Sequence, residues 1–304
     1  MPDVPGTARD RRIAILSTAK ADPLNRHLWP AEASDAYNQE SVLELAAAPP
    51  QPWLEEKGSP AGSLTTLSLE SRLLGNRRDI TIYRPAGFDP KRGDTVLLFV
   101  FDADQYLGRV PVPRMLDNMI AAGVIPPVVA VFVANPDRAA RARELPDNPA
   151  FADFMATELQ PRIVRETGIA VPASRTVLAG SSYGGLAAAT VAMRRPEVFG
   201  NVLSMSGSFW WSPPGTPEDR QEHVAGRIAA GGTLPLRFFL SAGLFETGAN
   251  GTAGILETSR HLRDVLQAKG ISVTYRDYAG GHDYLVWQGV LPDGLIALFG
   301  GERP

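Results

Sequence analysis

The sequence predicts an α/β protein with a mostly parallel central sheet and helices on both faces. Short apolar runs rich in β-branched and aromatic residues recur along the chain, and amphipathic segments separate several of them. The chain has 304 residues, of which 44% are hydrophobic and 21% charged. Such a chain is long enough to bury the core of one large α/β domain.

The predicted strands are almost continuously apolar, as expected where helices cover both faces of a sheet. They comprise residues 79–84, 95–101, 127–133, 175–180, 200–206, 235–241 and 271–278. The strand at 79–84 precedes the alternation with helices, so we expect it to pair antiparallel at an edge. Helical patterns occupy residues 111–122, 149–166, 184–195 and 253–269.

Residues 1–65 are irregular and contain proline-rich stretches such as AAAPPQPW at 46–53. We expect them to form an N-terminal extension, and residues 66–304 to form the α/β domain that carries any activity. Gly and Pro number 29 and 26 across the chain, which indicates many loops.

Composition excludes several classes of function. The formal net charge of -3 provides no basic field for nucleic acid. The chain has no Cys and only four dispersed His, so we expect no disulfide, metal site or cofactor. The longest apolar runs, such as VLLFVF and VVAVFVA, are too short to cross a membrane, and no stretch of signal-peptide length opens the chain. We therefore expect a soluble, cytoplasmic protein with no membrane partner.

The sharpest motif is G-x-S-x-G at 180–184, with Ser182 at its centre. It follows an apolar strand and precedes a helix of small residues, which is the context of a nucleophile elbow in an α/β-hydrolase. Gly180 and Gly184 would face each other too closely to carry side chains, and the backbone N–H of Tyr183 would point at a developing oxyanion. The alternative is a tightly packed or anion-binding glycine turn.

A serine nucleophile needs a base, which follows it in α/β-hydrolases. His282 lies in a loop after the last predicted strand, where it can reach the carboxyl edge of the sheet. His223 lies in a charged segment and His261 within a predicted helix, so both are expected to be surface or packing residues.

The acid that orients the base should follow a strand between these two residues. Glu246 follows the strand at 235–241 and fits this position. Asp264 lies on a helix and Asp277 within a strand, whereas Asp283 adjoins the histidine and ranks second. A surface carboxylate without a catalytic role is the alternative for Glu246.

The second oxyanion donor usually comes from a loop after an early central strand, here residues 101–106. A backbone N–H at Ala103 or Asp104 suits this role, although the sequence leaves the choice open. Acidic side chains beside an anionic intermediate are unfavourable, so we expect them to turn away or to bind backbone groups.

These motifs occur within blocks that resemble, in order, those of the enterochelin (enterobactin) esterase family, an α/β-hydrolase group of the esterase D-like superfamily. The resemblance covers about residues 66–299 and includes LLFVFDAD, ARARELPDNPAFADF, RTVLAGSSYGGLAA, RRPEVFGNVLSMSGSFWW and YAGGHDYLVWQGVLPDGL. It implies hydrolysis of the lactone bonds of a catecholate siderophore with release of iron. By position, Ser182 resembles the family's nucleophile, His282 its base and Glu246 its acid.

The resemblance also implies substrate contacts. Arg141 matches an arginine suited to an anionic catecholate. Trp210, Trp211 and Trp287 match aromatic positions that could flank catechol rings, with core packing as the alternative.

Two departures from the family are visible. Long members carry an N-terminal cap domain, whereas residues 22–53 here resemble the join that follows it, so residues 1–65 look like a linker left from a missing cap. Ala103 replaces the family's glycine between two loop acids. We therefore keep two alternatives, a carboxylesterase for another acyl or aryl ester and a non-catalytic module that binds an aromatic ligand.

Overall fold

The structure, a computed structural model, describes residues 6–7, 11, 14–15, 17–30, 39–45, 50–248 and 252–301. The chain forms two compact units, Met1–Pro50 and Gln51–Pro304. In the first, β1 (Leu28–Trp29) pairs antiparallel with β2 (Glu40–Ser41). Parts of the extension expected over residues 1–65 lie outside the described residues.

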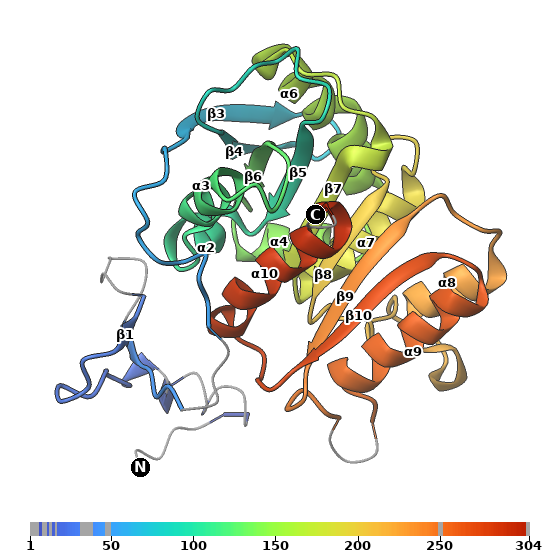
Figure 1. The fold of residues 1–304 in the computed structure, drawn as a ribbon. Helices are drawn as coiled ribbons and strands as arrows, with labels where there is room; N and C mark the ends of the chain where they lie inside the picture. Colours follow the sequence, from blue (N-terminus) through green and yellow to red (C-terminus); the bar gives the residue numbers. More distant parts are fainter. Residues whose placement is uncertain are drawn as a thin grey trace. The chain divides into compact units, whose positions relative to one another are not determined.

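The second unit contains an eight-stranded sheet with the order β10-β9-β8-β7-β5-β6-β4-β3 (Figure 1). Its strands are β3 (Ser63–Ser71), β4 (Asn76–Arg84), β5 (Val96–Phe101), β6 (Val128–Val133), β7 (Thr176–Ser181), β8 (Asn201–Met205), β9 (Arg237–Gly243) and β10 (Ser272–Tyr278). The six strands from β5 to β10 are parallel, β4 pairs antiparallel with β6, and β3 pairs antiparallel with β4. The predicted α/β fold with a mostly parallel sheet is confirmed.

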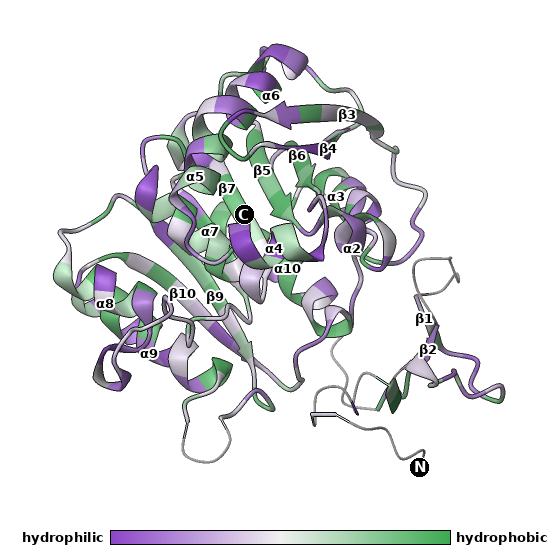
Figure 2. Ribbon diagram, turned by 180° about the vertical axis from the view of Figure 1, so that it is seen from behind, coloured by the Kyte–Doolittle hydropathy of each residue, from purple (hydrophilic) through white to green (hydrophobic). Residues whose placement is uncertain are grey.

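Helices cover both faces of this sheet, whose central strands are hydrophobic (Figure 2). The buried strands pack apolar side chains against both groups of helices. One face packs against α5 (Pro149–Asp153), η1 (Phe154–Leu159), α6 (Gln160–Thr167), α7 (Tyr183–Arg194), α8 (His223–Ala230) and α9 (Ile255–Ala268). The other packs against α2 (Ala103–Gly108), α3 (Val112–Ala121) and α10 (Tyr284–Phe299). In β5, Phe99 faces the first group and Leu98 the second.

The seven predicted strands are all present, and the four helical patterns fall on α3, the α5–η1–α6 segment, α7 and α9. Residues 79–84 pair antiparallel, as predicted, with β6. The expectation that they form the sheet edge is wrong, since β3 pairs with β4 and takes that place. Most of β3 is exposed, so its sequence lacks the apolar run of a buried strand. The 149–166 pattern is interrupted by a π-helical turn at η1.

The last helix, α10, was not predicted from periodicity. It is apolar on most sides and contains Pro292, so no single hydrophobic stripe marks it. Gly294 allows it to approach the sheet, because a Cβ there would lie 2.7 Å from Leu203 Cδ1. Burial against β8 and β9 therefore outweighs weak helix propensity.

Candidate active site

Ser182 occupies a strained turn between β7 and α7. Its backbone angles are φ 56° and ψ −121°, which L-residues rarely adopt. The turn closes because Gly180 lacks a side chain, since a Cβ there would lie 2.6 Å from the carbonyl carbon of Gly184. Tyr183 is the first residue of α7, so its backbone N–H lies in the helix turn that has no intrahelical acceptors.

Glu246 and His282 form a close pair at the carboxyl ends of β9 and β10. His282 Nδ1 lies 2.5 Å from Glu246 Oε1. The Glu246 side chain is 3% exposed, and that of His282 is 41% exposed. Glu246 is thus buried in the protein, whereas the imidazole of His282 is accessible to solvent.

The environment keeps the Glu246 carboxylate charged. Burial disfavours its ionisation, but hydrogen bonds from His282, from the Ser206 hydroxyl at 2.7 Å and from the Gly243 backbone N–H at 2.6 Å outweigh that penalty. The pKa of Glu246 is therefore below its ordinary value. A buried anion beside an imidazole is the arrangement that orients a histidine base.

A series of contacts connects Ser182 to this pair. The Ser182 N–H donates to the Met205 carbonyl of the neighbouring strand β8 at 3.1 Å, and its Oγ lies 3.4 Å from Ser208 Oγ. Ser206, between these two contacts in sequence, reaches Glu246. Among the described residues, no hydrogen bond joins Ser182 to His282. In hydrolases, the hydrogen bond between a serine nucleophile and its base often tightens only when substrate binds.

The loop predicted to supply an oxyanion donor lies beside the elbow. A Cβ on Gly184 would lie 3.4 Å from both Phe101 Cβ and Asp102 Oδ2. Asp102 has φ 58° and precedes α2, which Ala103 opens. Ala103 is buried and Asp104 is exposed.

We expected the acids of this loop to turn away or to bind backbone groups. Among the described residues, the Asp102 carboxylate instead binds side chains. Arg141 donates to both of its oxygens, at 2.6 and 2.8 Å, and Asn135 donates to Oδ1 at 2.6 Å. The guanidinium also lies 5.8 Å from the centre of the Tyr183 ring. Burial favours the neutral form of Arg141, but the Asp102 carboxylate outweighs this and raises its pKa. The charge beside the elbow is therefore compensated within the protein.

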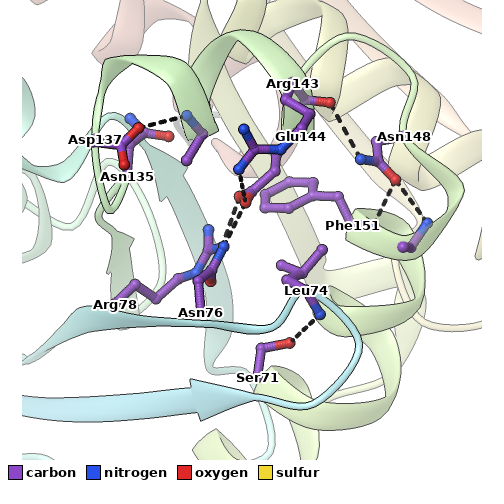
Figure 3. A network of polar contacts seen from close by, with 12 residues as sticks. Ser71, Leu74, Asn76, Arg78, Asn135, Asp137, Arg143, Glu144, Asn148 and Phe151 are labelled. Carbon is purple, nitrogen blue, oxygen red and sulfur yellow. Dashed lines mark hydrogen bonds and ion pairs between the residues drawn. The ribbon is translucent and has the colours of Figure 1, made fainter.

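The helix that carries Arg141, α4 (Arg138–Glu144), is anchored at both ends (Figure 3). Asp137 caps its start by accepting from the Ala140 N–H at 2.7 Å. At its end, the buried Glu144 carboxylate accepts from Arg78 at 2.7 Å and from Asn76 at 2.6 Å, both on β4. These contacts fix the position from which Arg141 reaches Asp102.

The three tryptophans expected near a substrate differ in exposure. Trp210 is 43% exposed, and its ring lies 6.3 Å from that of Tyr183. Trp211 is half-buried and meets the His223 ring edge-on. Trp287 is buried on α10, and the centres of the His282 and Tyr284 rings each lie 4.8 Å from the centre of its ring. Of the three, Trp210 is the one whose ring is most open to solvent.

Three polar residues of this region were not predicted as site residues: Asp102, Asn135 and Ser206. A usable signal exists, because each directly or closely follows the carboxyl end of a buried parallel strand, and those ends meet at one edge of the sheet. The part of the chain that the structure describes contains no cluster of potential metal ligands. Within the same residues, no helix is long and apolar enough to cross a membrane.

Comparison with known proteins assigns the chain to a family. Residues 71–298 match the family described as "Putative esterase", and residues 1–54 match the family described as "Enterochelin esterase, N-terminal". Together with the sheet topology, the first match defines an ester hydrolase with the α/β-hydrolase fold.

Curated relatives and solved structures narrow this assignment. The chain is 34% identical to the iron(III) enterobactin esterase of Dickeya dadantii over 96% of this chain and 67% of the relative. It is 32% identical to that of Escherichia coli strain K12, over 94% and 68%. A crystal structure of the Shigella flexneri enterobactin esterase in the presence of enterobactin superposes with a TM-score of 0.80 at 30% identity, covering 97% of this chain and 74% of that one. The chain belongs to the enterobactin esterase family, as the sequence resemblance predicted.

Proposed function

We propose that this protein hydrolyses the lactone esters of a catecholate siderophore such as enterobactin and so releases its iron. The relatives named enterobactin esterases support the substrate class. The contact between His282 and Glu246, at the same sheet edge as the strained Ser182 turn, carries the proposal for the chemistry. Iron enters as part of the substrate.

In the proposed mechanism, Ser182 Oγ attacks the ester carbonyl while His282 Nε2 accepts its proton. Glu246 holds His282 through Nδ1–H and stabilises the imidazolium that forms. His282 then protonates the leaving alkoxide, and the acyl group stays on Ser182. A water molecule, deprotonated by His282, attacks the acyl carbonyl. The bond to Ser182 Oγ then breaks, His282 returns the proton to Oγ, and the carboxylic acid product leaves.

The negative charge that develops on the carbonyl oxygen requires backbone donors. We propose the N–H of Tyr183 as one donor and that of Ala103 or Asp104 as the second. Asp102 precedes these loop residues, and its pairing with Arg141 compensates a carboxylate charge that would otherwise oppose the oxyanion.

For the substrate, we propose that Trp210 contacts a catechol ring and that Arg141, which is paired with Asp102 but remains 29% exposed, donates a hydrogen bond to the anionic catecholate. Phe245, 75% exposed and next to Glu246 in sequence, supplies a further apolar surface. Trp211 and Trp287 support this region from within the packed core.

The decisive experiment is labelling with a fluorophosphonate probe, followed by a hydrolysis screen. Wild type should react with the probe, and Ser182→Ala should abolish both labelling and turnover. Ser181→Ala is the matched control, because Ser181 is the adjacent serine and is completely buried, out of reach of the probe. Ser181→Ala should therefore still be labelled.

The screen should compare enterobactin, its ferric complex, its linear trimer and p-nitrophenyl esters. Faster turnover of the trilactone supports the proposed substrate. Much faster turnover of simple aryl esters would favour a carboxylesterase of other specificity. A wild-type protein that binds aromatic ligands without labelling would be a binding module.

A further inference from the structure

Two buried side chains outside the proposed triad, those of Ser206 and Trp287, contact its acid and its base. Ser206 follows β8, has φ 48° and is almost completely buried. Its Oγ lies 2.7 Å from Glu246 Oε2 and 2.9 Å from Trp287 Nε1. Its backbone N–H donates to the Ser241 carbonyl at 2.9 Å, which fixes the residue between β8 and β9.

The chemistry of these groups determines the direction of each hydrogen bond. The Trp287 indole N–H can only donate, so Ser206 Oγ must accept from it. The single Ser206 O–H then points to Glu246, whose carboxylate can only accept when ionised. Gly243 donates its N–H to the same oxygen, Oε2. Oε1 therefore remains for His282.

The directions of these hydrogen bonds determine the tautomer of the His282 imidazole. An ionised Glu246 can only accept from His282 Nδ1, so Nδ1 carries the hydrogen and Nε2 of the neutral ring keeps its lone pair. That is the tautomer that can remove a proton from Ser182. The Trp287 ring also meets the imidazole at 88°, which limits rotation of the base.

We infer that Ser206 and Trp287 are positioning residues for the proposed catalytic pair: through the hydrogen bonds from Trp287 to Ser206 and from Ser206 to Glu246, they fix the Glu246 carboxylate and thereby the His282 tautomer. The sequence resemblance suggested Trp287 as a substrate contact. In the structure it is buried, donates to Ser206 and packs against the imidazole of His282. The inference rests on the proposed function.

Steady-state kinetics of Ser206→Ala test it. Loss of one hydrogen bond to a charged group should lower kcat by about tenfold to a hundredfold, with KM changed by less than about twofold. The acid limb of the kcat/KM profile should move to higher pH, because Glu246 loses a donor that favours its ionised form. The groups in contact with the Glu246 carboxylate are His282, Ser206 and the Gly243 N–H. Ser259→Ala removes another buried serine hydroxyl, on α9, which has no hydrogen-bond partner in the described part of the chain, and should change neither quantity.

Trp287→Phe separates the hydrogen bond from packing, since phenylalanine keeps an aromatic ring but has no N–H. It should lower kcat by less than Ser206→Ala does. The double variant should be no more than about twofold slower than Ser206→Ala alone, because both changes interrupt one chain of hydrogen bonds. Multiplicative effects would overturn the coupling, and unchanged kcat and pH profile in Ser206→Ala would overturn the inference.

A proton NMR measurement distinguishes failure of this inference from failure of the proposed function. The His282 Nδ1 proton should resonate at low field in wild type, disappear in His282→Ala and shift in Ser206→Ala. This signal does not depend on turnover. A protein with no esterase activity but a shifted signal would refute the function and leave the positioning role intact, whereas an unshifted signal would overturn the positioning role. Thermal unfolding midpoints of all variants identify any loss of folding.

Discussion

Ser182 is flanked by two buried carboxylates with very different partners. On the β9–β10 side, Glu246 faces His282, whose imidazole can both accept and donate a proton. On the β5–β6 side, Asp102 faces Arg141, which stays charged under all ordinary conditions. Glu246 is 3% exposed and Asp102 4%, so burial does not distinguish them.

The difference lies in what each partner can do. The Glu246–His282 pair can take part in proton transfer, because its histidine is open on one face. The Asp102–Arg141 pair holds a loop and a helix in register through a bidentate contact. A buried carboxylate near an active site therefore acquires its role from its partner rather than from its depth.

The largest expected effect comes from exchanging the two carboxylates for amides. Glu246→Gln should lower kcat by about a thousandfold to ten-thousandfold, since an amide can hold the wrong imidazole tautomer. Asp102→Asn should lower kcat far less but destabilise the fold more, by about 3 kcal/mol, because Arg141 loses its counter-charge. Ester hydrolysis and urea unfolding measure the two effects. A larger loss of turnover in Asp102→Asn would reverse the comparison.

Arg141 variants test what the Asp102–Arg141 pair contributes to catalysis and to substrate binding. Because Arg141 holds Asp102, Arg141→Ala should lower kcat on small neutral esters by about tenfold as well as raise KM for a catecholate siderophore. Arg141→Lys should recover part of the siderophore KM but not the kcat, since lysine cannot make the bidentate contact. Kinetics on p-nitrophenyl acetate and on enterobactin separate these effects. If small esters are unaffected by Arg141→Ala, the arginine acts on substrate alone.

A third buried carboxylate, Asp147, serves as a structural reference. Burial opposes its ionisation, but Arg194, His223 and Arg227 outweigh this and hold its pKa below the ordinary value. Arg194 ends α7, whereas Ser182 precedes its first residue. Asp147→Asn should therefore lower stability by about 3 kcal/mol at pH 7 and leave turnover within about twofold.

The pH dependence of that loss follows from the depressed pKa. A carboxylate whose pKa falls on folding contributes stability above its unfolded value of about 4, and this contribution disappears as pH falls through the folded value. The difference in unfolding free energy between wild type and Asp147→Asn should thus be full at pH 7 and shrink below about pH 4. A constant difference down to pH 2 would show that packing rather than charge is responsible.

The smallest effect is expected at Asp283, the carboxylate that ranked second to Glu246 as the orienting acid. Its side chain accepts from the Leu285 N–H at 2.8 Å and so caps α10. Asp283→Ala should cost about 1 kcal/mol of stability, with a much smaller loss of turnover than Glu246→Ala. Kinetics and thermal unfolding of the two alanine variants provide the test, and the opposite ranking would reassign the acid.

Much of the fold was predictable because the buried strands are apolar on both faces. That pattern identified β5 to β9, and β-branched and aromatic residues identified β4 and β10, which are polar on one face. The pattern missed the exposed strand β3 and the helix α10, whose residues are apolar on most sides. In the site, chain order and strand ends were sufficient to nominate Ser182, Glu246 and His282. The structure places the last two in contact, and their catalytic roles stay predictions.

Local pattern was sufficient wherever one segment determines its own shape, as the two glycines do for the turn at Ser182. The partners of Asp102, Arg141 and Ser206 could not be predicted in this way. Arg141 lies 39 residues beyond Asp102, and Trp287 lies 81 beyond Ser206. Such pairs form only when neighbouring parallel strands bring their carboxyl ends together, so the chain order specifies the strands and the packed sheet selects the pairs.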